Sequence, residues 1–534
     1  MKITEYIADQ LFREGVRFVF GIPGGPSIPY MEAFRKTGIE FILTANEASA
    51  GIMADVTARL TGVPGVCHAT FGPGATNILT GVGGALLDRS PVIVFTSEVS
   101  DAMSGRTTQM KIDHQKLFAP VTKATFRLDP GNAVEVLEKA FRICREEYPG
   151  PVHIGLPSDI AGKEIEDNRE TFLVKADNKD KKDNEKISSM LARSRRPLLA
   201  VGLTAKRLGL KDKLMAFLGT YRMPVVITPM AKGIIPETHP SYCGVLFHAL
   251  SDRLENICEK SDLIIGLGYD PVEYNYESWM PDVPLIHFNS IPADLPERDN
   301  VYQFTGQPGE WFSILSGLNP GSLIFEQGII RGIRDEMTSV FNGFANHFGP
   351  VTVLRKLREE LPDDSIVTAD VGSHLHLAGQ LWETGDRGTL IMTNGWSGMG
   401  FGLPAAMAAK MNSPRSIVAC ITGDGGFLMQ AGEIITARRH NLHIIIVVLS
   451  DGELNLIKLK QEWNDISPYG TALYEGELFE ADRFLGCRVL NADSGESMVR
   501  AVRQAISLNG PVIINARIDP GDYKWLVVRQ PAGG

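Results

Sequence analysis

The side chains best placed to bind a metal ion are two carboxylates that each follow an apolar run. Asp424 comes shortly after the run SIVACIT (residues 416–422), and Asp451 comes shortly after HIIIVVL (residues 443–449). Both runs predict buried parallel strands, and neighbouring strands lie about 4.8 Å apart, so the two carboxylates can reach one cation. Carboxylate, carbonyl and water oxygens are ligands that suit Mg²⁺ or Ca²⁺.

The glycines around Asp424 predict a phosphate site beside the metal. Gly423, Gly425 and Gly426 let backbone N–H groups come close to an anion. A helix predicted over about residues 428–440 would point its N-terminus at the same place. A GDG sequence alone is also typical of an ordinary turn, and the second acid at a strand end is what favours a metal-bridged diphosphate site.

The elements that must position this site are short β-rich runs that alternate with helical stretches. We predict four buried strands in each of three segments: 18–21, 41–44, 65–69 and 91–96; 197–201, 224–228, 263–267 and 284–288; 365–369, 416–422, 443–449 and 511–516. Strands separated by helices predict parallel sheets covered on both faces. The expected fold is three α/β domains with doubly wound parallel sheets, whose ligands bind at the carboxyl ends of the strands.

Two breaks divide the chain into these domains. The polar stretch KADNKDKKDNEK (residues 175–186) predicts a solvated linker, and a second break is expected near GFANHFGP (residues 343–350). The predicted domains are therefore residues 1–170, 188–340 and 350–534.

The composition of the chain excludes several classes of protein. Of its 534 residues, 44% are hydrophobic and 22% are charged, which is ordinary for a globular protein. The formal net charge of −10 argues against a general nucleic-acid binder. The six cysteines are scattered singly, so neither a disulfide framework nor a structural zinc site is expected. Because there is no long apolar run and no signal segment, we expect a cytoplasmic protein that does not enter a membrane.

The metal motif resembles that of thiamine diphosphate-dependent enzymes, in which GDG is followed, beyond the next apolar strand, by an Asn or Asp. The resemblance implies that Asp424, Asp451 and the backbone carbonyl of Glu453 hold Mg²⁺ against the cofactor diphosphate. The family usually has Asn where this chain has Asp451, and Asp still offers an oxygen ligand. The resemblance also implies diphosphate contacts from the turn after the strand that runs into Asp370, formed by Gly372, Ser373 and His374.

An enzyme of this kind needs a carboxyl group at N1′ of the cofactor, where it stabilises the imino form that removes the C2 proton. Glu47 is the candidate, because NEASAGIMADVTARLTG (residues 46–62) resembles the family's glutamate, Ala-rich helix and Arg. Taken alone, Glu47 is also typical of a first-turn acid favoured by the helix dipole. FGPGATN (residues 71–77) resembles the family's GPGATN loop, which implies cofactor contacts from Gly72 and Asn77.

The bent cofactor of this family also needs an apolar side chain beneath it. NGWSGMGFGL (residues 394–403) resembles the segment that provides it. The resemblance implies that Met399 is the support and that the carbonyl of Ser397 accepts a hydrogen bond from the cofactor's 4′-amino group. An ordinary core methionine is the alternative for Met399.

Several segments resemble acetolactate synthases in particular, and the resemblance is closest to the catabolic, FAD-independent ones. They are FGIPGG (residues 20–25, with Gly24 as a cofactor contact), LFAPVTK (117–123), GLGYDPVEYNYESW (266–279), LIHFNSIPADL (285–295) and DGELNLIKLKQ (451–461). The resemblance implies thiamine diphosphate and Mg²⁺ as cofactors, without a requirement for FAD.

Other positions depart from acetolactate synthases and concern the choice of substrate. Those enzymes carry Gln where this chain has Met110, whereas Gln109, the predicted catalytic glutamine, lies next to it as in benzaldehyde-lyase-type enzymes. His114 and Gln115 are further candidates for substrate contact. His68 is unusual just before the GPG loop. Two lysines stand where synthases carry uncharged or aromatic residues, and they could pair with a substrate carboxylate: Lys458 and Lys460.

The implied reaction is decarboxylation of a 2-oxo acid such as pyruvate, followed by carboligation to a second carbonyl. Alternatives within the family are a 2-hydroxy ketone or 2-hydroxyacyl lyase and a simple 2-oxo acid decarboxylase. A Rossmann-type NAD protein is disfavoured because no GxGxxG follows a first strand. An inactive homologue is disfavoured by Glu47, Asp424 and Asp451. The resemblance also implies a homodimer or homotetramer whose active sites form between the first domain of one subunit and the third domain of another.

Overall fold

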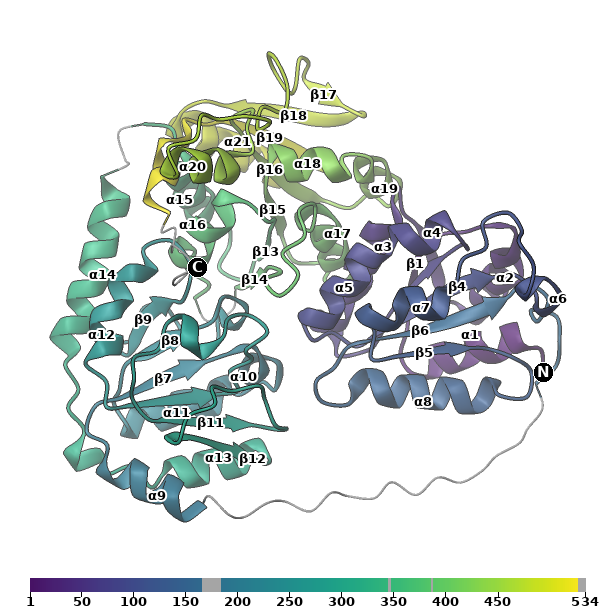
Figure 1. Cartoon of the computed structure of the whole chain (residues 1–534). Helices are drawn as coiled ribbons and strands as arrows, with labels where there is room; N and C mark the ends of the chain where they lie inside the picture. Colours follow the sequence, from purple (N-terminus) through teal and green to yellow (C-terminus); the bar gives the residue numbers. More distant parts are fainter. Residues whose placement is uncertain (166–183, 344–346, 386–387, 527–534) are drawn as a thin grey trace.

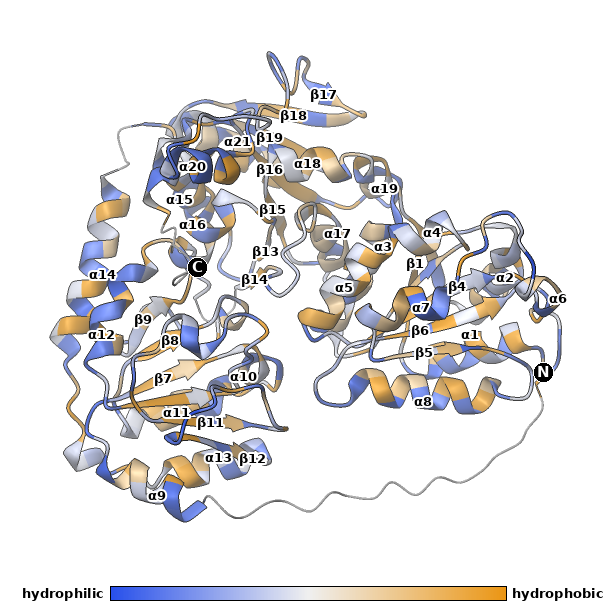
Figure 2. Cartoon of the chain, viewed as in Figure 1, coloured by the Kyte–Doolittle hydropathy of each residue, from blue (hydrophilic) through white to orange (hydrophobic). Residues whose placement is uncertain are grey.

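The structure of the protein is a computed structural model that describes residues 1–165, 184–343, 347–385 and 388–526. Three mainly parallel sheets follow one another along the chain, and helices flank each of them (Figure 1). The strands are mostly apolar, while many helices show both polar and apolar faces (Figure 2). The predicted fold class, three α/β domains with doubly wound parallel sheets, is confirmed.

The first sheet has the strand order β2-β1-β3-β4-β6-β5, and all its pairs are parallel. Its strands are β1 (Phe18–Ile22), β2 (Glu40–Leu43), β3 (Gly65–Ala69), β4 (Val92–Glu98), β5 (Ala124–Arg127) and β6 (Pro151–Pro157). Its helices are α1 (Ile3–Arg13), α2 (Ile28–Thr37), α3 (Glu47–Thr61), α4 (Pro73–Asn77), α5 (Leu79–Leu87), α6 (Asp101–Ser104), α7 (His114–Phe118) and α8 (Ala133–Arg145). Strands β3, β4 and β6 are buried along their whole length, as both-face coverage requires.

The second sheet has the order β12-β11-β10-β7-β8-β9, again with parallel pairs. Its strands are β7 (Pro197–Val201), β8 (Val225–Ile227), β9 (Tyr242–Val245), β10 (Leu263–Leu267), β11 (Leu285–Asn289) and β12 (Val301–Thr305). Its helices are α9 (Asn184–Arg193), α10 (Leu203–Arg207), α11 (Lys211–Thr220), α12 (Glu255–Glu259), α13 (Pro308–Leu315) and α14 (Gln327–Asn342).

The third sheet has the order β14-β13-β15-β16-β19-β18-β17, and only the edge pair β17–β18 is antiparallel. Its strands are β13 (Ile366–Ala369), β14 (Thr389–Ile391), β15 (Val418–Gly423), β16 (Ile444–Ser450), β17 (Arg483–Phe484), β18 (Cys487–Ala492) and β19 (Val512–Arg517). Its helices are α15 (Pro350–Glu360), α16 (Ser373–Leu381), α17 (Gly402–Asn412), α18 (Asp424–Gln430), α19 (Glu433–Arg439), α20 (Asn455–Trp463) and α21 (Gly495–Ser507).

Every predicted strand is present with small differences at its ends, but the predicted helix over residues 428–440 is wrong. The helix α18 begins at Asp424 itself and ends at Gln430, and α19 begins at Glu433. Gly432 lies at the interruption, and a Cβ there would come 3.2 Å from the Cβ of Ala45 in the first domain. The break therefore lies where the first domain packs closely against the third.

The predicted linker and domain boundaries are only partly within the described residues. Residues 175–183 of the predicted linker lie outside them, and residues 184–186 begin α9. Residues 344–346 of the second break also lie outside them. Among the described residues, no helix is both long and apolar enough to span a membrane. All six cysteines are free and buried.

The first and third domains share an apolar interior. One buried cluster joins Phe20 and Val82 of the first domain to Phe401 and Phe427 of the third. Helix α3 packs against α17. This contact fixes the N-terminal end of α3, which begins with Glu47, beside α18 and α19.

Candidate functional site

Asp424 and Asp451 meet at the carboxyl ends of the adjacent parallel strands β15 and β16. Oδ2 of Asp424 accepts hydrogen bonds from the backbone N–H groups of Asp451 (3.1 Å) and Gly452 (2.7 Å) and from the hydroxyl of Tyr474 (3.0 Å). Its Oδ1 accepts one from the Gly425 N–H at 2.8 Å. The structure thus brings together the two carboxylates that the sequence places at strand ends.

The two carboxylates affect each other's protonation. Burial raises the pKa of Asp424. Burial and then the negative charge of Asp424 raise the pKa of Asp451 to about 7. Two partly desolvated acids that repel each other form a site in which a divalent cation removes the repulsion.

The third predicted metal ligand, the carbonyl of Glu453, lies beside this pair. Glu453 forms an isolated bridge with Ala472, whose two hydrogen bonds join Leu454 N to Thr471 O and Leu473 N to Gly452 O. Neither bond uses the Glu453 carbonyl, so the bridge leaves that oxygen available. The N–H of Glu453 donates to Oδ1 of Asp451 at 3.1 Å, which holds the turn against the carboxylate.

A cavity of about 140 Å³ opens beside the carboxylates. Its lining includes Met399 and the following predicted residues: Gly372, Ser373, His374, Gly423, Asp424, Gly425, Gly426, Asp451 and Glu453. In the described part of the chain, Oγ of Ser373 and Nε2 of His374 are buried without a hydrogen-bond partner. Two unpartnered polar groups beside a GDG helix start suit an anionic ligand such as a diphosphate.

Asp370, which the sequence analysis did not single out as a site residue, ties the cavity wall together. Its Oδ1 accepts from the N–H groups of Gly400 (2.9 Å) and Phe401 (3.2 Å), and its Oδ2 accepts from the hydroxyl of Thr422 (2.9 Å). Burial raises the pKa of Asp370 to about 6. One side chain thereby fixes both the loop that carries Met399 and the strand that leads into Asp424.

The loop before α17 carries the other two predicted cofactor contacts. Ser397 has a φ of +53°, and its hydroxyl donates to the carbonyl of Asn394 at 2.7 Å. The methyl carbon of Met399 would lie 3.1 Å from a Cβ on Gly425, so the support and the GDG turn are in close contact.

Glu47 begins α3 and is buried, with 8% of its surface exposed. Its Oε2 accepts a hydrogen bond from Nδ2 of Asn77 at 3.2 Å. The N-cap Asn46 accepts from the N–H of Ala48, and Glu433 on α19 accepts from the N–H groups of Ala45 and Asn46. Glu47 is absent from the described lining of the carboxylate cavity, which contains only residues of the third domain. Glu47 therefore belongs to the first domain and is not among the third-domain residues that line this cavity.

The remaining first-domain candidates lie around the GPG loop. Gly72 has a φ of +68°, and a Cβ there would come 2.8 Å from the carbonyl oxygen of Met110. Gln109, beside Met110, is exposed. Gly24 lies against Thr70, where a Cβ would come 2.3 Å from the Thr70 hydroxyl oxygen.

Three polar residues near this loop have partners inside the domain. His114 bonds to Thr96 at 2.8 Å and accepts from the N–H of Gly72 at 3.4 Å. Gln115 donates to Glu98, whose carboxylate Arg127 also binds. Glu98 lies close to His114 and His153, and both histidines share the hydroxyl of Thr96 as a hydrogen-bond partner. Burial lowers the pKa of His68 to about 4, and Ser27 is its partner at 2.6 Å.

Other residues of the site were missed because they come from distant or irregular segments. Tyr474, which donates to Asp424, lies within the long irregular stretch between α20 and β17. Asn455, which donates to Oδ2 of Asp451 at 3.0 Å, follows the metal turn and could have been found as a polar start of a helix. Glu433 joins two domains, and no local pattern predicts such a contact.

Family models match three successive segments of this chain. The model described as thiamine pyrophosphate enzyme, N-terminal TPP binding domain, matches residues 1–117. The central-domain model of the same family matches residues 185–313, and its C-terminal TPP binding domain model matches residues 370–516. The chain belongs to the thiamine pyrophosphate enzyme family. It is thus an enzyme that depends on thiamine pyrophosphate, which is the same compound as thiamine diphosphate.

Curated relatives in this family cover nearly the whole chain. The probable acetolactate synthase large subunit of Methanocaldococcus jannaschii is 29% identical and covers 100% of this chain and 94% of its own length. The acetolactate synthase isozyme 2 large subunit of Escherichia coli is 28% identical, and the alignment covers 99% of this chain and 97% of the relative. The acetolactate synthase of Bacillus subtilis is 28% identical, and the alignment covers 97% of this chain and 93% of the relative. The predicted resemblance to acetolactate synthases is confirmed.

Proposed function

We propose that this enzyme uses thiamine diphosphate and Mg²⁺ to decarboxylate a 2-oxo acid such as pyruvate and to join the remaining fragment to a second carbonyl compound, as an acetolactate synthase does. The observation that carries the proposal is the paired carboxylate site of Asp424 and Asp451. It stands in a chain that also buries Glu47 and that aligns with acetolactate synthases over nearly its full length.

Mg²⁺ would be held by the side chains of Asp424 and Asp451 and by the carbonyl of Glu453. The donor set is made of hard oxygens. Burial and then repulsion from Asp424 raise the pKa of Asp451, and a bound cation would offset both effects. The cofactor diphosphate would lie beside them, where Ser373 and His374 offer unpartnered polar atoms. Gly423, Gly425 and Gly426 keep the backbone at the start of α18 open to it.

When bound, the cofactor supplies a C2 carbanion and a thiazolium ring that accepts the electrons released by decarboxylation. The residues of this chain hold and activate it. Glu47 would bind the proton at N1′, the carbonyl of Ser397 would accept from the 4′-amino group, and Met399 would support the bend. Gly24, Gly72 and Asn77 would shape the first-domain side.

A second copy of the chain would complete the site. Glu47 belongs to the first domain and the carboxylate cavity to the third, and the resemblance to thiamine diphosphate enzymes implies that each site takes these two parts from different copies. The surface of α18 and α19 exposes apolar side chains that suit burial in such a contact, namely Leu428 (40% exposed), Met429 (54%) and Ile435 (44%). The proposed assembly is a homodimer or homotetramer.

FAD would not be required. In doubly wound sheets a nucleotide binds at the carboxyl ends of the strands. In the central domain those ends are joined to the first domain, because Arg89 binds Asp270 (2.7 Å) and Asn289 at the end of β11 donates to the hydroxyl of Tyr148 (2.9 Å). At the ends of β10 and β11, side chains of the first domain therefore occupy part of the edge that a flavin nucleotide would use.

The substrate carboxylate would meet the start of α20. Lys458 lies one residue beyond the cavity-lining Ile457, and its ammonium is 3.2 Å from a carboxylate oxygen of Glu453. Lys460 is exposed on the same helix. Gln109 is exposed near the GPG loop and is the first-domain candidate for contact with the second substrate.

The position of Gln109 also favours a second candidate, a lyase that cleaves 2-hydroxy ketones or 2-hydroxyacyl compounds. A simple 2-oxo acid decarboxylase is the third member of this group. All three would use the same cofactor site. The synthase and the decarboxylase release CO₂ and differ in whether a second carbonyl compound or a proton is then added, whereas the lyase cleaves a C–C bond without releasing CO₂.

The test is to incubate the enzyme with thiamine diphosphate, Mg²⁺ and ¹³C-pyruvate and to identify the products by NMR. An acetolactate synthase gives 2-acetolactate and releases one CO₂ for every two pyruvates consumed. Acetaldehyde with one CO₂ for each pyruvate indicates a decarboxylase instead. Turnover of a 2-hydroxy ketone without turnover of pyruvate indicates a lyase.

A further inference from the structure

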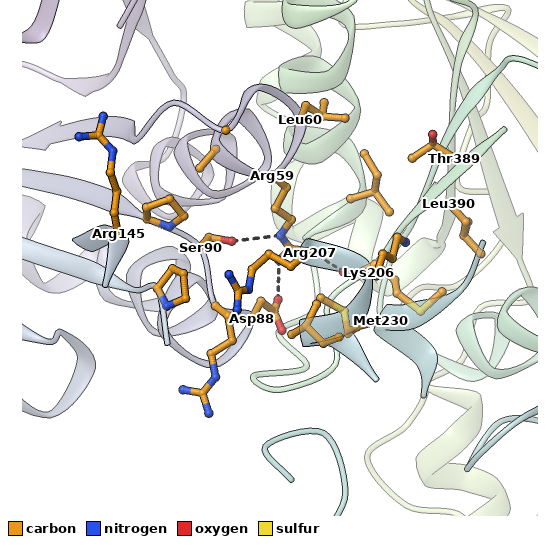
Figure 3. Close-up of a pocket in the computed structure, with 18 residues that line it drawn as sticks. Arg59, Leu60, Asp88, Ser90, Arg145, Lys206, Arg207, Met230, Thr389 and Leu390 are labelled. Atoms are coloured by element: carbon orange, nitrogen blue, oxygen red, sulfur yellow. Dashed lines mark hydrogen bonds and ion pairs between the residues drawn. The ribbon is translucent and has the colours of Figure 1, made fainter. Parts of the chain in front are cut away.

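A second, larger cavity lies where the three domains meet (Figure 3). Its volume is about 400 Å³, and it shares no residue with the carboxylate cavity. The first domain contributes Arg59 and Asp88, the central domain contributes Lys206 and Met230, and the third contributes Met392.

Five cations line this cavity against a single carboxylate, Asp88. Four of them are arginines with carboxylate partners. Arg59 binds Asp55 and Asp88, Arg89 binds Asp270, Arg145 binds Glu14, and Arg207 binds Glu147.

Lys206 is the cation that differs. Its ammonium donates to the carbonyl of Lys232 at 2.7 Å, and no described carboxylate lies within salt-bridge distance of it. Burial, and then the positive charge of Arg59, lowers the pKa of Lys206 to about 8. A negative group placed beside Lys206 would give its ammonium the direct carboxylate contact that each of the four arginines already has.

Apart from Ser90 and Thr389, the rest of the lining has no polar side chain. Leu60, Leu203, Met230, Leu390 and Ile391 contribute side chains to the same wall. A cationic group set in an apolar cavity suits a ligand with one anionic head and an apolar body. A single carboxylate matches the single lysine without a carboxylate partner.

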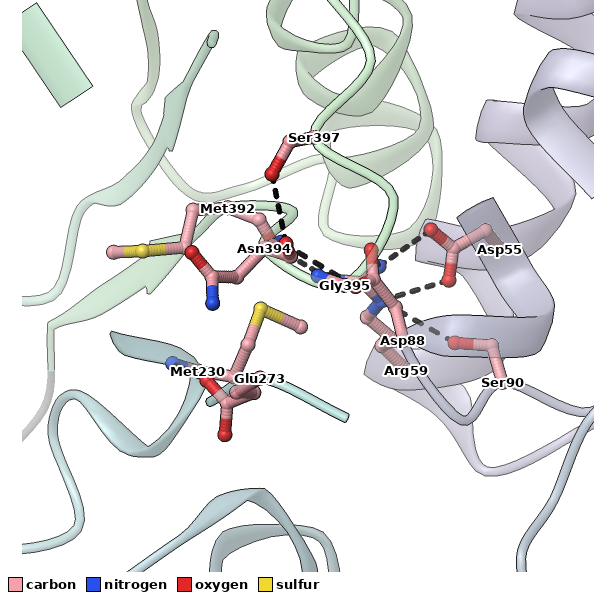
Figure 4. Close-up of polar contacts among 10 residues, drawn as sticks. All are labelled: Asp55, Arg59, Asp88, Ser90, Met230, Glu273, Met392, Asn394, Gly395 and Ser397. Carbon is pink, nitrogen blue, oxygen red and sulfur yellow. Dashed lines mark hydrogen bonds and ion pairs between the residues drawn. The ribbon is translucent and has the colours of Figure 1, made fainter. Parts of the chain in front are cut away.

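The cavity wall also holds the loop that leads to Ser397 and Met399 (Figure 4). Nη1 of Arg59 donates to the carbonyl of Met392 at 2.7 Å. Asp88 accepts from the N–H groups of Asn394 (3.4 Å) and Gly395 (3.1 Å). A ligand that contacts Arg59 or Asp88 therefore acts on the loop whose far end forms the cofactor site.

We propose that this three-domain cavity is an effector site that binds a small carboxylate with an apolar body through Lys206, and that its occupancy changes the affinity of the enzyme for thiamine diphosphate. The binding part rests on the cavity alone. The coupling part rests on the proposed cofactor contacts of Ser397 and Met399. By reciprocity, the cofactor must change the affinity for the carboxylate by the same factor.

Binding is tested with the full-length protein labelled with [methyl-¹³C]methionine, titrated with 3-methylbutanoate without cofactor. The Met230 methyl signal, assigned with Met230→Leu, should move saturably. Two further probes separate the charge of the ligand from its apolar body. The uncharged 3-methylbutanamide keeps the shape without the charge, and acetate keeps the charge without the apolar body. Each should bind at least tenfold more weakly. Equal binding of the amide, or no saturable shift with 3-methylbutanoate, overturns the proposal.

Lys206→Gln should weaken 3-methylbutanoate binding at least tenfold, whereas Lys213→Gln, an exposed lysine of the same domain, should leave it unchanged. Lys206→Gln can still donate to the Lys232 carbonyl, and the amide probe tests the charge on the unmutated protein if this variant fails to fold. The affinity for thiamine diphosphate, measured by calorimetry with and without saturating 3-methylbutanoate, should differ at least threefold. Equal affinities overturn the coupling while leaving the proposed chemistry of the cofactor site untouched.

Discussion

Asp424 accepts four hydrogen bonds, from Gly425, Asp451, Gly452 and Tyr474. The polypeptide thus orients its carboxylate independently of any metal. Strand-end reasoning from the sequence finds Asp424 and Asp451, because the position of a residue after an apolar run is a local property. It does not find Tyr474, because the role of Tyr474 depends on which distant segment packs beside Asp424. Asp370 also follows a predicted strand, but its bonds to Gly400 and Thr422 join distant segments and cannot be predicted locally.

Replacing Asp424 by Asn keeps the size of the side chain but removes its charge. We expect Asp424→Asn to weaken Mg²⁺-dependent binding of thiamine diphosphate at least tenfold, since the metal loses a charged ligand. Asp482→Asn, at an exposed position of the same domain, should bind the cofactor normally. Calorimetric titration of both variants measures this, and full affinity in Asp424→Asn would remove Asp424 from the metal site.

The raised pKa of Asp451, about 7, predicts a pH effect on stability in metal-free protein. Between about pH 4, the ordinary pKa of Asp, and about pH 7, the folded protein holds a proton on this acid that the unfolded protein has released. The free energy of unfolding therefore falls as the pH rises through this range. In EDTA, the unmutated protein should therefore lose unfolding free energy relative to Asp451→Asn over this range. Urea unfolding at several pH values tests this, and a difference independent of pH would contradict it.

At the element scale, the packing of α3 against α5 holds Glu47, the first residue of α3, near Asn77, the last residue of α4. Helices α3 and α5 cross at two glycines, where a Cβ on Gly81 would lie 2.6 Å from the carbonyl oxygen of Ala48 and 2.7 Å from the Cα of Gly51. Such a crossing cannot be predicted from one segment, because each glycine by itself is compatible with many contacts. The same limit explains why the prediction of one helix over residues 428–440 is wrong. The local pattern does not reveal the break at Gly432, which depends on contact with the first domain.

Gly81→Ala should separate α3 from α5 and move Glu47 away from Asn77. We expect a loss of about 1–3 kcal/mol of stability, as for overpacked cores, and a clear loss of activity. Gly84→Ala is the matched control on the same helix, since a Cβ there meets nothing within 4 Å. Thermal unfolding and turnover of both variants measure this, and equal behaviour of the two would refute the role of the crossing.

At the scale of the whole molecule, three sheets of the predicted class place two half-sites on one chain. The alternation of strands and helices suffices to predict the sheets, because buried parallel strands are continuous apolar runs. It does not predict how the domains meet, which depends on contacts such as Glu433 with Ala45 and Asn46. The proposed assembly follows from this arrangement.

A mixture of Glu47→Ala and Asp424→Ala proteins tests that assembly. Each variant alone should be inactive, and after subunit exchange the mixture should regain at most about one quarter of the normal activity, because half of the dimers are mixed and each contains one intact site. Activity is measured after exchange in mild denaturant, with a mock-treated sample of each variant alone. No recovery despite mixed dimers shown by mass spectrometry would contradict a site shared between subunits.

The central claim is that Glu47 activates the cofactor. Glu47→Gln should retain cofactor and metal, since Gln nearly keeps the shape, but it cannot hold the proton at N1′. Hydrogen–deuterium exchange at C2 of the bound cofactor, followed by acid quench and NMR, measures this step directly. Exchange should slow by about 10²–10⁴-fold, the scale of general acid–base catalysis. Glu138→Gln, at an exposed site of the same domain, should exchange normally. Exchange in Glu47→Gln as fast as in the unmutated enzyme would contradict the account.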